Sequence, residues 1–208
     1  NNAIAADPTF PAPYLELFNY YSNRDVVRAK GYLDDFLKYA DKDPLNDFFY
    51  AEYLFRAGKY SESLAKAKEI EASAGLASAP RLSLLYAYNY DRLGDSVAAR
   101  DNVIKFFDAK LDIQSQDYDL AVKLLSKFPG QEAQTVGYLE QAIGNDTSRV
   151  NKLGYMNQAA DLYGKAKMYK EQLFWLNKVM VAKGSMGESD FYRTTLAALN
   201  AKDYTQTM

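Results

Sequence analysis

The chain of 208 residues contains no cysteine and no histidine. It therefore has no disulfide, no zinc site built on these residues, no cysteine nucleophile and no histidine general base. Lysine and arginine number 25 against 27 aspartates and glutamates, which gives a net charge of −2. Because this balance creates no positive field for a polyanion, we expect no nucleic-acid partner. No apolar run approaches the roughly 18 residues of a membrane span, so we expect no direct membrane insertion.

The chain is rich in apolar and aromatic residues, which make up 48% and 14% of it. That content supports a folded core and is unlike the composition of a disordered chain. Six short turn signals recur at intervals of 34 to 37 residues. The second residues of these turns are Arg24, Gly58, Gly94, Gly130, Lys167 and Lys202. Recurrence at a fixed period indicates stacked copies of one small structural unit.

Apolar stripes with a helical period lie on both sides of the turns. The first stripe has the i, i+3, i+4, i+7 spacing of one helix face and consists of Tyr14, Leu17, Phe18 and Tyr21. Five residues after each turn position the side chain is mostly small: Ala29, Ser63, Ala99, Thr135, Gln172 and Thr207. Each turn is therefore predicted to join two helices that approach closely at these positions.

Glycine and proline placement adds detail to this prediction. Gly31 and Gly137 both lie seven residues past their turn positions, inside expected second helices. Glycine in a helix costs roughly 1 kcal/mol relative to alanine, so their shared position indicates close helix packing. Five of the six prolines fall between helix pairs and Pro129 falls in a turn, so none interrupts an expected helix.

These residues resemble the tetratricopeptide repeat (TPR) family, whose unit is a helix–turn–helix of about 34 residues. The resemblance is carried by Tyr50-Ala51, Leu54, Gly58-Lys59-Tyr60, Ser63 and the closing element Asp7-Pro8. It implies an all-α, right-handed α-solenoid of TPR-type helix–turn–helix repeats. It also suggests a fragment of a longer bacterial TPR-repeat protein.

We expect a single TPR-like array over residues 1–208, with about five helix pairs and partial repeats at both ends. Its expected units are 1–8 (the end of a preceding repeat), 9–44, 45–80, 81–115, 116–148, 149–186 and a truncated repeat at 187–208.

Motifs for metal binding and catalysis are incomplete. Asp41 to Asp47, with Glu52 further on, faintly resembles a calcium loop, but its sixth position is not glycine and a proline interrupts it. We interpret the segment as a solvated turn between repeats. Trp175 is interpreted as packing between helices rather than as a stacking platform. The sequence thus predicts no catalytic residues, no metal ligands, no cofactor-binding residues and no cofactor.

In the TPR family the first helix of each pair lines the concave face of the superhelix, where a peptide or partner domain binds. Transferring those positions gives a candidate surface of Leu15, Asn19, Phe48, Glu52, Phe55, Arg56, Leu84, Tyr88, Asp91, Arg92, Asp119, Lys123, Asn157 and Asp161. The mixture of aromatic, acidic and arginine side chains suits an extended or amphipathic segment. It lacks the Lys/Asn pattern of family members that clamp a terminal carboxylate.

The sequence therefore predicts a noncatalytic protein–protein interaction scaffold. One alternative is a helical-repeat enzyme or a carbohydrate- or small-molecule-binding module that uses carboxylates, for example Asp34 with Asp35 or Asp117 with Asp119. A deep closed pocket lined by carboxylates would favour it. A second alternative is a structural spacer with no partner of its own. The lack of cysteine is compatible with an oxidising compartment and favours the bacterial periplasm or cell envelope.

Overall fold

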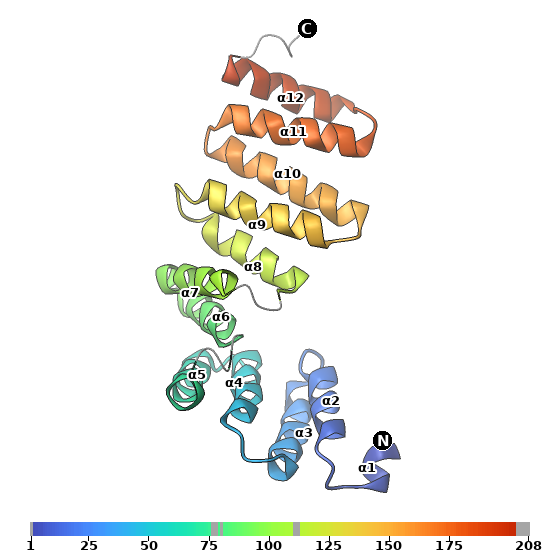
Figure 1. Ribbon diagram of the computed structural model, residues 1–208, viewed down its shortest axis with the longest axis vertical. Helices are drawn as coiled ribbons and strands as arrows, with labels where there is room; N and C mark the ends of the chain where they lie inside the picture. The colour runs from blue at the N-terminus through green and yellow to red at the C-terminus, as the bar shows by residue number, and fades with distance from the viewer. Residues whose placement is uncertain (1, 76–78, 80, 110–112, 203–208) are drawn as a thin grey trace. The chain divides into compact units, whose positions relative to one another are not determined.

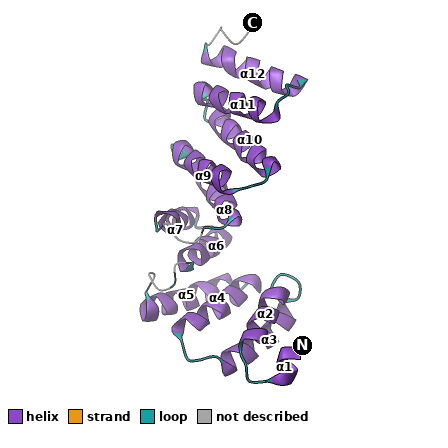
Figure 2. Cartoon of the chain, turned by 45° about the vertical axis from the view of Figure 1, so that its right-hand side comes forward, coloured by secondary structure: helices purple, strands orange, loops and turns teal. Residues whose placement is uncertain are grey.

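The computed structural model describes residues 2–75, 79, 81–109 and 113–202 (Figure 1). These residues form helices joined by turns and loops, and none of them lies in a β-strand, as Figure 2 shows. The chain divides into two compact units, Asn1–Leu111 (unit 1) and Asp112–Met208 (unit 2).

Unit 1 is a stack of helices in chain order. They are α1 Asn2–Ala6, α2 Ala12–Tyr21, α3 Val26–Tyr39, the 3₁₀ helix η1 Pro44–Asn46, α4 Asp47–Arg56, α5 Tyr60–Ala74, α6 Leu82–Leu93 and α7 Ser96–Asp108. The closest partners are α2 with α3, α4 with α5 and α6 with α7, and each pair packs on the next.

Unit 2 continues with α8 Ser115–Leu125, α9 Glu132–Asn145, α10 Arg149–Lys165, α11 Tyr169–Lys183 and α12 Glu188–Ala201. Each helix packs mainly on its neighbours in the chain. Such packing is typical of a helical solenoid, so the predicted all-α solenoid of helix–turn–helix repeats is confirmed. The repeat boundaries and the single array over residues 1–208 stay predictions.

The predicted turns coincide with left-handed backbone. Positive φ angles, from 59° to 86°, occur at five of the six turn positions: Gly58, Gly94, Gly130, Lys167 and Lys202. Glycine adopts this conformation freely because it has no Cβ, whereas a lysine pays about 1 kcal/mol. The recurring signal in the sequence therefore marks where the chain must reverse.

The small positions of the second helices are buried as predicted. Four of these residues are at most 1% exposed: Ala29, Ser63, Ala99 and Thr135. Thr207 lies outside the described residues. The fifth pair places the larger Gln172 at this position, and Gly164 of α10 leaves the space for it. A Cβ at Gly164 would overlap the side-chain amide of Gln172.

Gly31 and Gly137 do not mark close packing, so that prediction is wrong. A Cβ added to either residue would meet no atom within 4 Å. Gly31 lies on the exposed side of α3, away from the face that packs. These two glycines therefore lower helix propensity without a packing benefit.

Gly31→Ala should stabilise the protein by about 0.5–1 kcal/mol, because it restores helix propensity in open space. Gly94→Ala is the matched control. Its φ of +86° is unfavourable for alanine, so stability should fall by a similar amount or more. Urea unfolding followed by circular dichroism measures both changes. A destabilised Gly31→Ala variant would show that α3 requires glycine there.

Candidate functional site

The candidate surface of unit 1 centres on aromatic contacts between α4 and α6. The ring centroids of Phe55 and Tyr88 are 5.6 Å apart. Phe55 also contacts Tyr60 of α5, at 5.5 Å between centroids. Phe48 and Phe55 pack on the core beneath while remaining partly exposed. These rings form an apolar area shared by two neighbouring repeats.

Charged groups lie beside the rings. Glu52, half-buried on α4, interacts with Arg56 one turn later and with Arg81 at the start of α6. Burial raises the pKa of the Glu52 carboxyl above its ordinary value of 4.5, and the two guanidinium groups partly oppose that rise. Arg56 donates a hydrogen bond to Oδ1 of Asn23, in the turn between α2 and α3. The carboxylate and the arginines thus flank the aromatic area.

The remaining predicted residues of unit 1 differ in their access to solvent. Asn19 and Arg92 are exposed, and Leu15 and Asp91 are half-buried. Leu84 is only 2% exposed, so it is not available to a partner and does not belong to the surface. The reason is that α6 packs against both α5 and α7, which covers almost all of its first two turns.

In unit 2, Asn157 and Asp161 lie one turn apart on α10 and share one partner. Arg193 of α12 donates to Oδ1 of Asn157 at 2.9 Å and to Oδ1 of Asp161 at 2.7 Å. We did not predict Arg193 from the sequence. Its signal in the sequence is its separation of 36 residues, one repeat period, from Asn157. Asp119 and Lys123 lie on the exposed side of α8.

An open hollow of about 530 Å³ lies between α8 and α10, on the first helices of unit 2. Its lining mixes apolar and charged side chains from both helices, the turn after α8 and the start of α9: Val122, Lys127, Pro129, Glu132, Asp161, Leu162 and Lys165. This composition suits a surface that binds a polypeptide better than a closed catalytic pocket.

One member of each carboxylate pair has a structural role. Asp117 is fully buried and accepts the backbone N–H of Gln114 at 2.9 Å, which caps α8. Asp34 forms an ion pair with Lys30 at 2.5 Å. Among the described residues, no group of three or more acidic side chains could hold a metal ion. Within the same ranges, no helix is long and apolar enough to cross a membrane.

Two other sequence motifs also take the roles expected of them. Oδ1 of Asp43 accepts the N–H of Leu45 at 2.8 Å, and Asp47 pairs with Lys66 at 2.6 Å. The calcium-like segment is therefore a turn followed by a helix start. Trp175 is 3% exposed, which confirms the prediction that it packs between helices.

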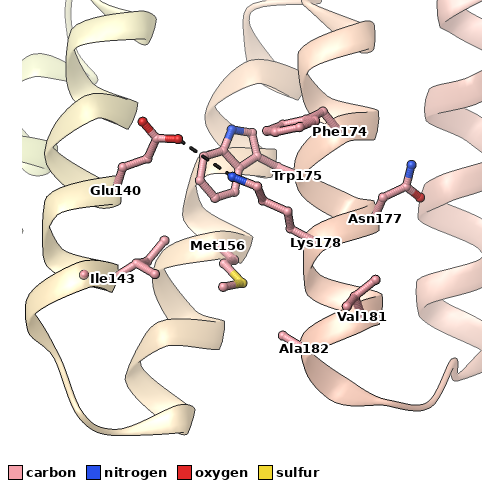
Figure 3. A pocket seen from close by; sticks show the side chains of 10 residues that line it. Glu140, Ile143, Met156, Phe174, Trp175, Asn177, Lys178, Val181 and Ala182 are labelled. Atoms are coloured by element: carbon pink, nitrogen blue, oxygen red, sulfur yellow. Dashed lines mark ion pairs between the residues drawn. The ribbon is translucent and has the colours of Figure 1, made fainter.

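A second hollow, of about 620 Å³, lies on the second helices of unit 2 and was not predicted (Figure 3). Its apolar lining comes from α9, α10 and α11: Ile143, Met156, Phe174, Trp175, Val181 and Ala182. Lys178 of α11 reaches across it to Glu140 of α9, at 3.8 Å. In the sequence, this hollow is indicated by Phe174 and Val181, two apolar residues that lie outside the core stripe of α11.

No family model matches the chain, and no curated protein matches it. Among solved structures, the chain is similar to PilW, described as a widely conserved type IV pilus biogenesis factor. The match has a TM-score of 0.59 and 12% sequence identity, and it covers 95% of this chain and 88% of that chain. At this identity the likeness shows a shared helical-repeat fold.

Glu52→Gln tests the environment at the centre of the unit 1 surface. Because burial raises the pKa of Glu52 above 4.5, the folded chain holds the proton more tightly than the unfolded chain. The stability contributed by Glu52 is therefore greatest at low pH and falls as the pH rises above 4.5. Glutamine mimics the neutral acid, so Glu52→Gln should unfold at higher urea than wild type at pH 7. That gain should shrink below pH 4.5.

Urea midpoints at several pH values measure the effect, and Glu16→Gln on the exposed side of α2 is the control that should show no gain. A lower midpoint for Glu52→Gln at pH 7 would mean that Arg56 and Arg81 outweigh the burial of the carboxylate.

Proposed function

We propose that this chain is a noncatalytic helical-repeat scaffold that binds an extended peptide or a partner domain through the first helices of its pairs. The observation that supports this most is the grouping of Phe55 and Tyr88 with Glu52 on α4 and α6. Aromatic residues and arginine are the side chains that most often dominate binding energy at protein interfaces. A half-buried carboxylate at such a surface lowers stability, which is typical of residues kept for recognition.

The chemistry of this surface suggests the type of segment that it binds. The Phe55–Tyr88 area offers apolar contact for one anchoring side chain. The guanidinium groups of Arg56 and Arg92 can donate to the carbonyl or carboxylate oxygens of an extended chain. Glu52 can accept from a backbone N–H or pair with a basic side chain. An extended or amphipathic segment with an apolar anchor and flanking charges satisfies all three.

The carboxylate-based enzyme or sugar-binding module is less well supported. Asp117 is committed to a helix cap and Asp34 to an ion pair. The hollows of unit 2 are open and mostly bordered by apolar or oppositely charged groups. A spacer with no partner would not need the aromatic and charged grouping on α4 and α6.

We further propose a location in the bacterial cell envelope. The similarity to PilW, described as a type IV pilus biogenesis factor, is consistent with association with the envelope. The lack of cysteine agrees with an oxidising compartment.

Tyr88→Ala and Arg92→Ala should each weaken partner binding by about 1 kcal/mol or more, which is roughly fivefold. The partner is first captured from an extract of the source organism, and its affinity is then measured by calorimetric titration. Far-UV circular dichroism should show an unchanged fold, because both side chains retain some exposure.

The matched control is the double variant Tyr20→Ala, Arg24→Ala. These two exposed residues have the same i, i+4 spacing, and the Arg24 guanidinium lies 4.2 Å from the Tyr20 ring centre. They are not part of the proposed surface, so affinity should stay at the wild-type value. If the Tyr88, Arg92 double variant binds as tightly as wild type, the interface lies elsewhere on the chain.

A further inference from the structure

The apolar hollow on the second helices of unit 2 belongs to a longer groove. A neighbouring hollow of about 400 Å³ shares Glu140, Phe174 and Trp175 with it. Together they extend along α9 from Ala133 to Gly144 and along α11 over a similar length. Figure 3 shows side chains of α9 and α11 on either side, with Met156 of α10 between them. We call this the α9–α11 groove.

The groove leaves large apolar side chains in contact with water. Phe174 is 55% exposed and Val181 is 84% exposed, and the buried Trp175 lies at their base. A contiguous exposed apolar area on a folded protein commonly marks a binding site. The Glu140–Lys178 ion pair bridges the groove, and the two side chains are 55% and 41% exposed. Such an exposed pair contributes little stability by itself, and the Lys178 ammonium also lies 4.5 Å and 4.2 Å from the ring centres of Phe174 and Trp175.

Unit 2 also contains a helix with an apolar stripe that is about half exposed among the described residues. Tyr192, Leu196 and Leu199 of α12 are 66%, 45% and 48% exposed. Their i, i+4, i+7 spacing places them on one face of the helix. The opposite face of α12 is buried against α11. The side of α12 that faces water thus carries an exposed apolar stripe.

We propose that α12 of a second copy of this chain docks in the α9–α11 groove. An amphipathic helix that lies in an apolar groove is a recurrent mode of recognition. The lengths agree, because α9 and α12 each contain 14 residues, or about 21 Å of helix. This site is on the second helices and does not depend on the proposed partner surface of the first helices.

The charges around both surfaces are compatible with this contact. The groove is bordered by Lys170 and Lys178 and by Glu140 and Glu171, so it carries no net charge. At the two ends of α12 lie an acidic residue, Glu188, and a basic one, Lys202. With a chain net charge of only −2, two copies meet little electrostatic repulsion.

A single helix in a groove is a small interface. If each copy inserts its α12 into the groove of the other, the contact is made twice across a two-fold axis and the assembly closes as a dimer. The doubled contact brings the buried area towards the roughly 1,600 Å² of a standard stable interface.

Analytical ultracentrifugation of the 208-residue chain tests the proposal. The wild type should show a concentration-dependent dimer. Val181→Glu, in the groove, and Leu199→Glu, on the stripe, should each weaken dimerisation at least tenfold, because each places a charge in an apolar contact. Val27→Glu on α3 of unit 1 is the control, because Val27 is 85% exposed, like Val181, and lies outside both surfaces. It should dimerise like wild type.

Mixing the two disrupted variants separates this arrangement from other dimers. The Val181→Glu chain keeps an intact α12 and the Leu199→Glu chain keeps an intact groove, so a mixture should recover part of the association. If α12 instead bound α12 of the second copy, Val181→Glu would dimerise normally, and adding the Leu199→Glu chain would produce no further association. That result would overturn the proposal.

Two further outcomes bear on the proposal. A wild-type chain that stays monomeric at every accessible concentration would overturn it and favour another partner for the stripe. Larger assemblies that both variants abolish would support the same contact, made head to tail rather than reciprocally. Circular dichroism of each variant confirms that it is folded.

Discussion

The fold depends on the close approach of two helices at one small buried residue near the start of the second helices α3, α5, α7 and α9. In unit 1 this contact is clearest at Ser63 of α5. Its hydroxyl donates to the carbonyl of Ala51 in α4 at 2.8 Å and accepts from Nδ2 of Asn89 in α6 at 2.9 Å. A side chain of this size lets the backbones approach, and its hydroxyl accepts from the buried Asn89 amide, which also donates to the carbonyl of Leu85. One residue thereby joins three successive helices.

Because each helix buries its apolar stripe against its neighbours, other faces are left for different uses. On α4 and α6 the first-helix side gathers aromatic rings, one half-buried carboxylate and several arginines. In unit 2 the second helices α9 and α11 both pack on α10 and make little direct contact with each other. The space between them is the α9–α11 groove. Both surfaces therefore result from the packing of each helix on its neighbours in the chain. One lies on first helices of the pairs, and the α9–α11 groove lies on second helices.

Much of the architecture could be predicted from the sequence, because turns and small residues recur with a period that few folds produce. Gly58 and Gly94 indicate the left-handed turns directly, because glycine adopts positive φ angles freely. The lysine turns at Lys167 and Lys202 were found only through their spacing, since lysine has no intrinsic preference for that conformation.

The candidate surface was less predictable than the fold. The helical period predicts on which face of α6 Leu84 lies. It does not show that α5 and α7 cover α6 on two sides. Likewise, the hydrogen bonds from Arg193 to Asn157 and Asp161 depend on side-chain conformations, which the sequence pattern does not specify. The packing prediction for Gly31 was wrong because its position relative to the turn does not show which atoms surround it. Those atoms decide whether close packing requires a glycine there.

In four of the helix pairs, a small residue near the start of the second helix sets how closely the two helices pack. The unfolding free energies of Ser63→Leu and Ser61→Leu test this, because both serines lie on α5 and only Ser63 is buried. We expect Ser63→Leu to lose about 1–3 kcal/mol or more, from overpacking and two lost hydrogen bonds. Ser61→Leu should stay within about 0.5 kcal/mol of wild type. If the two substitutions have equal effects, the size of the residue at position 63 does not set the helix packing.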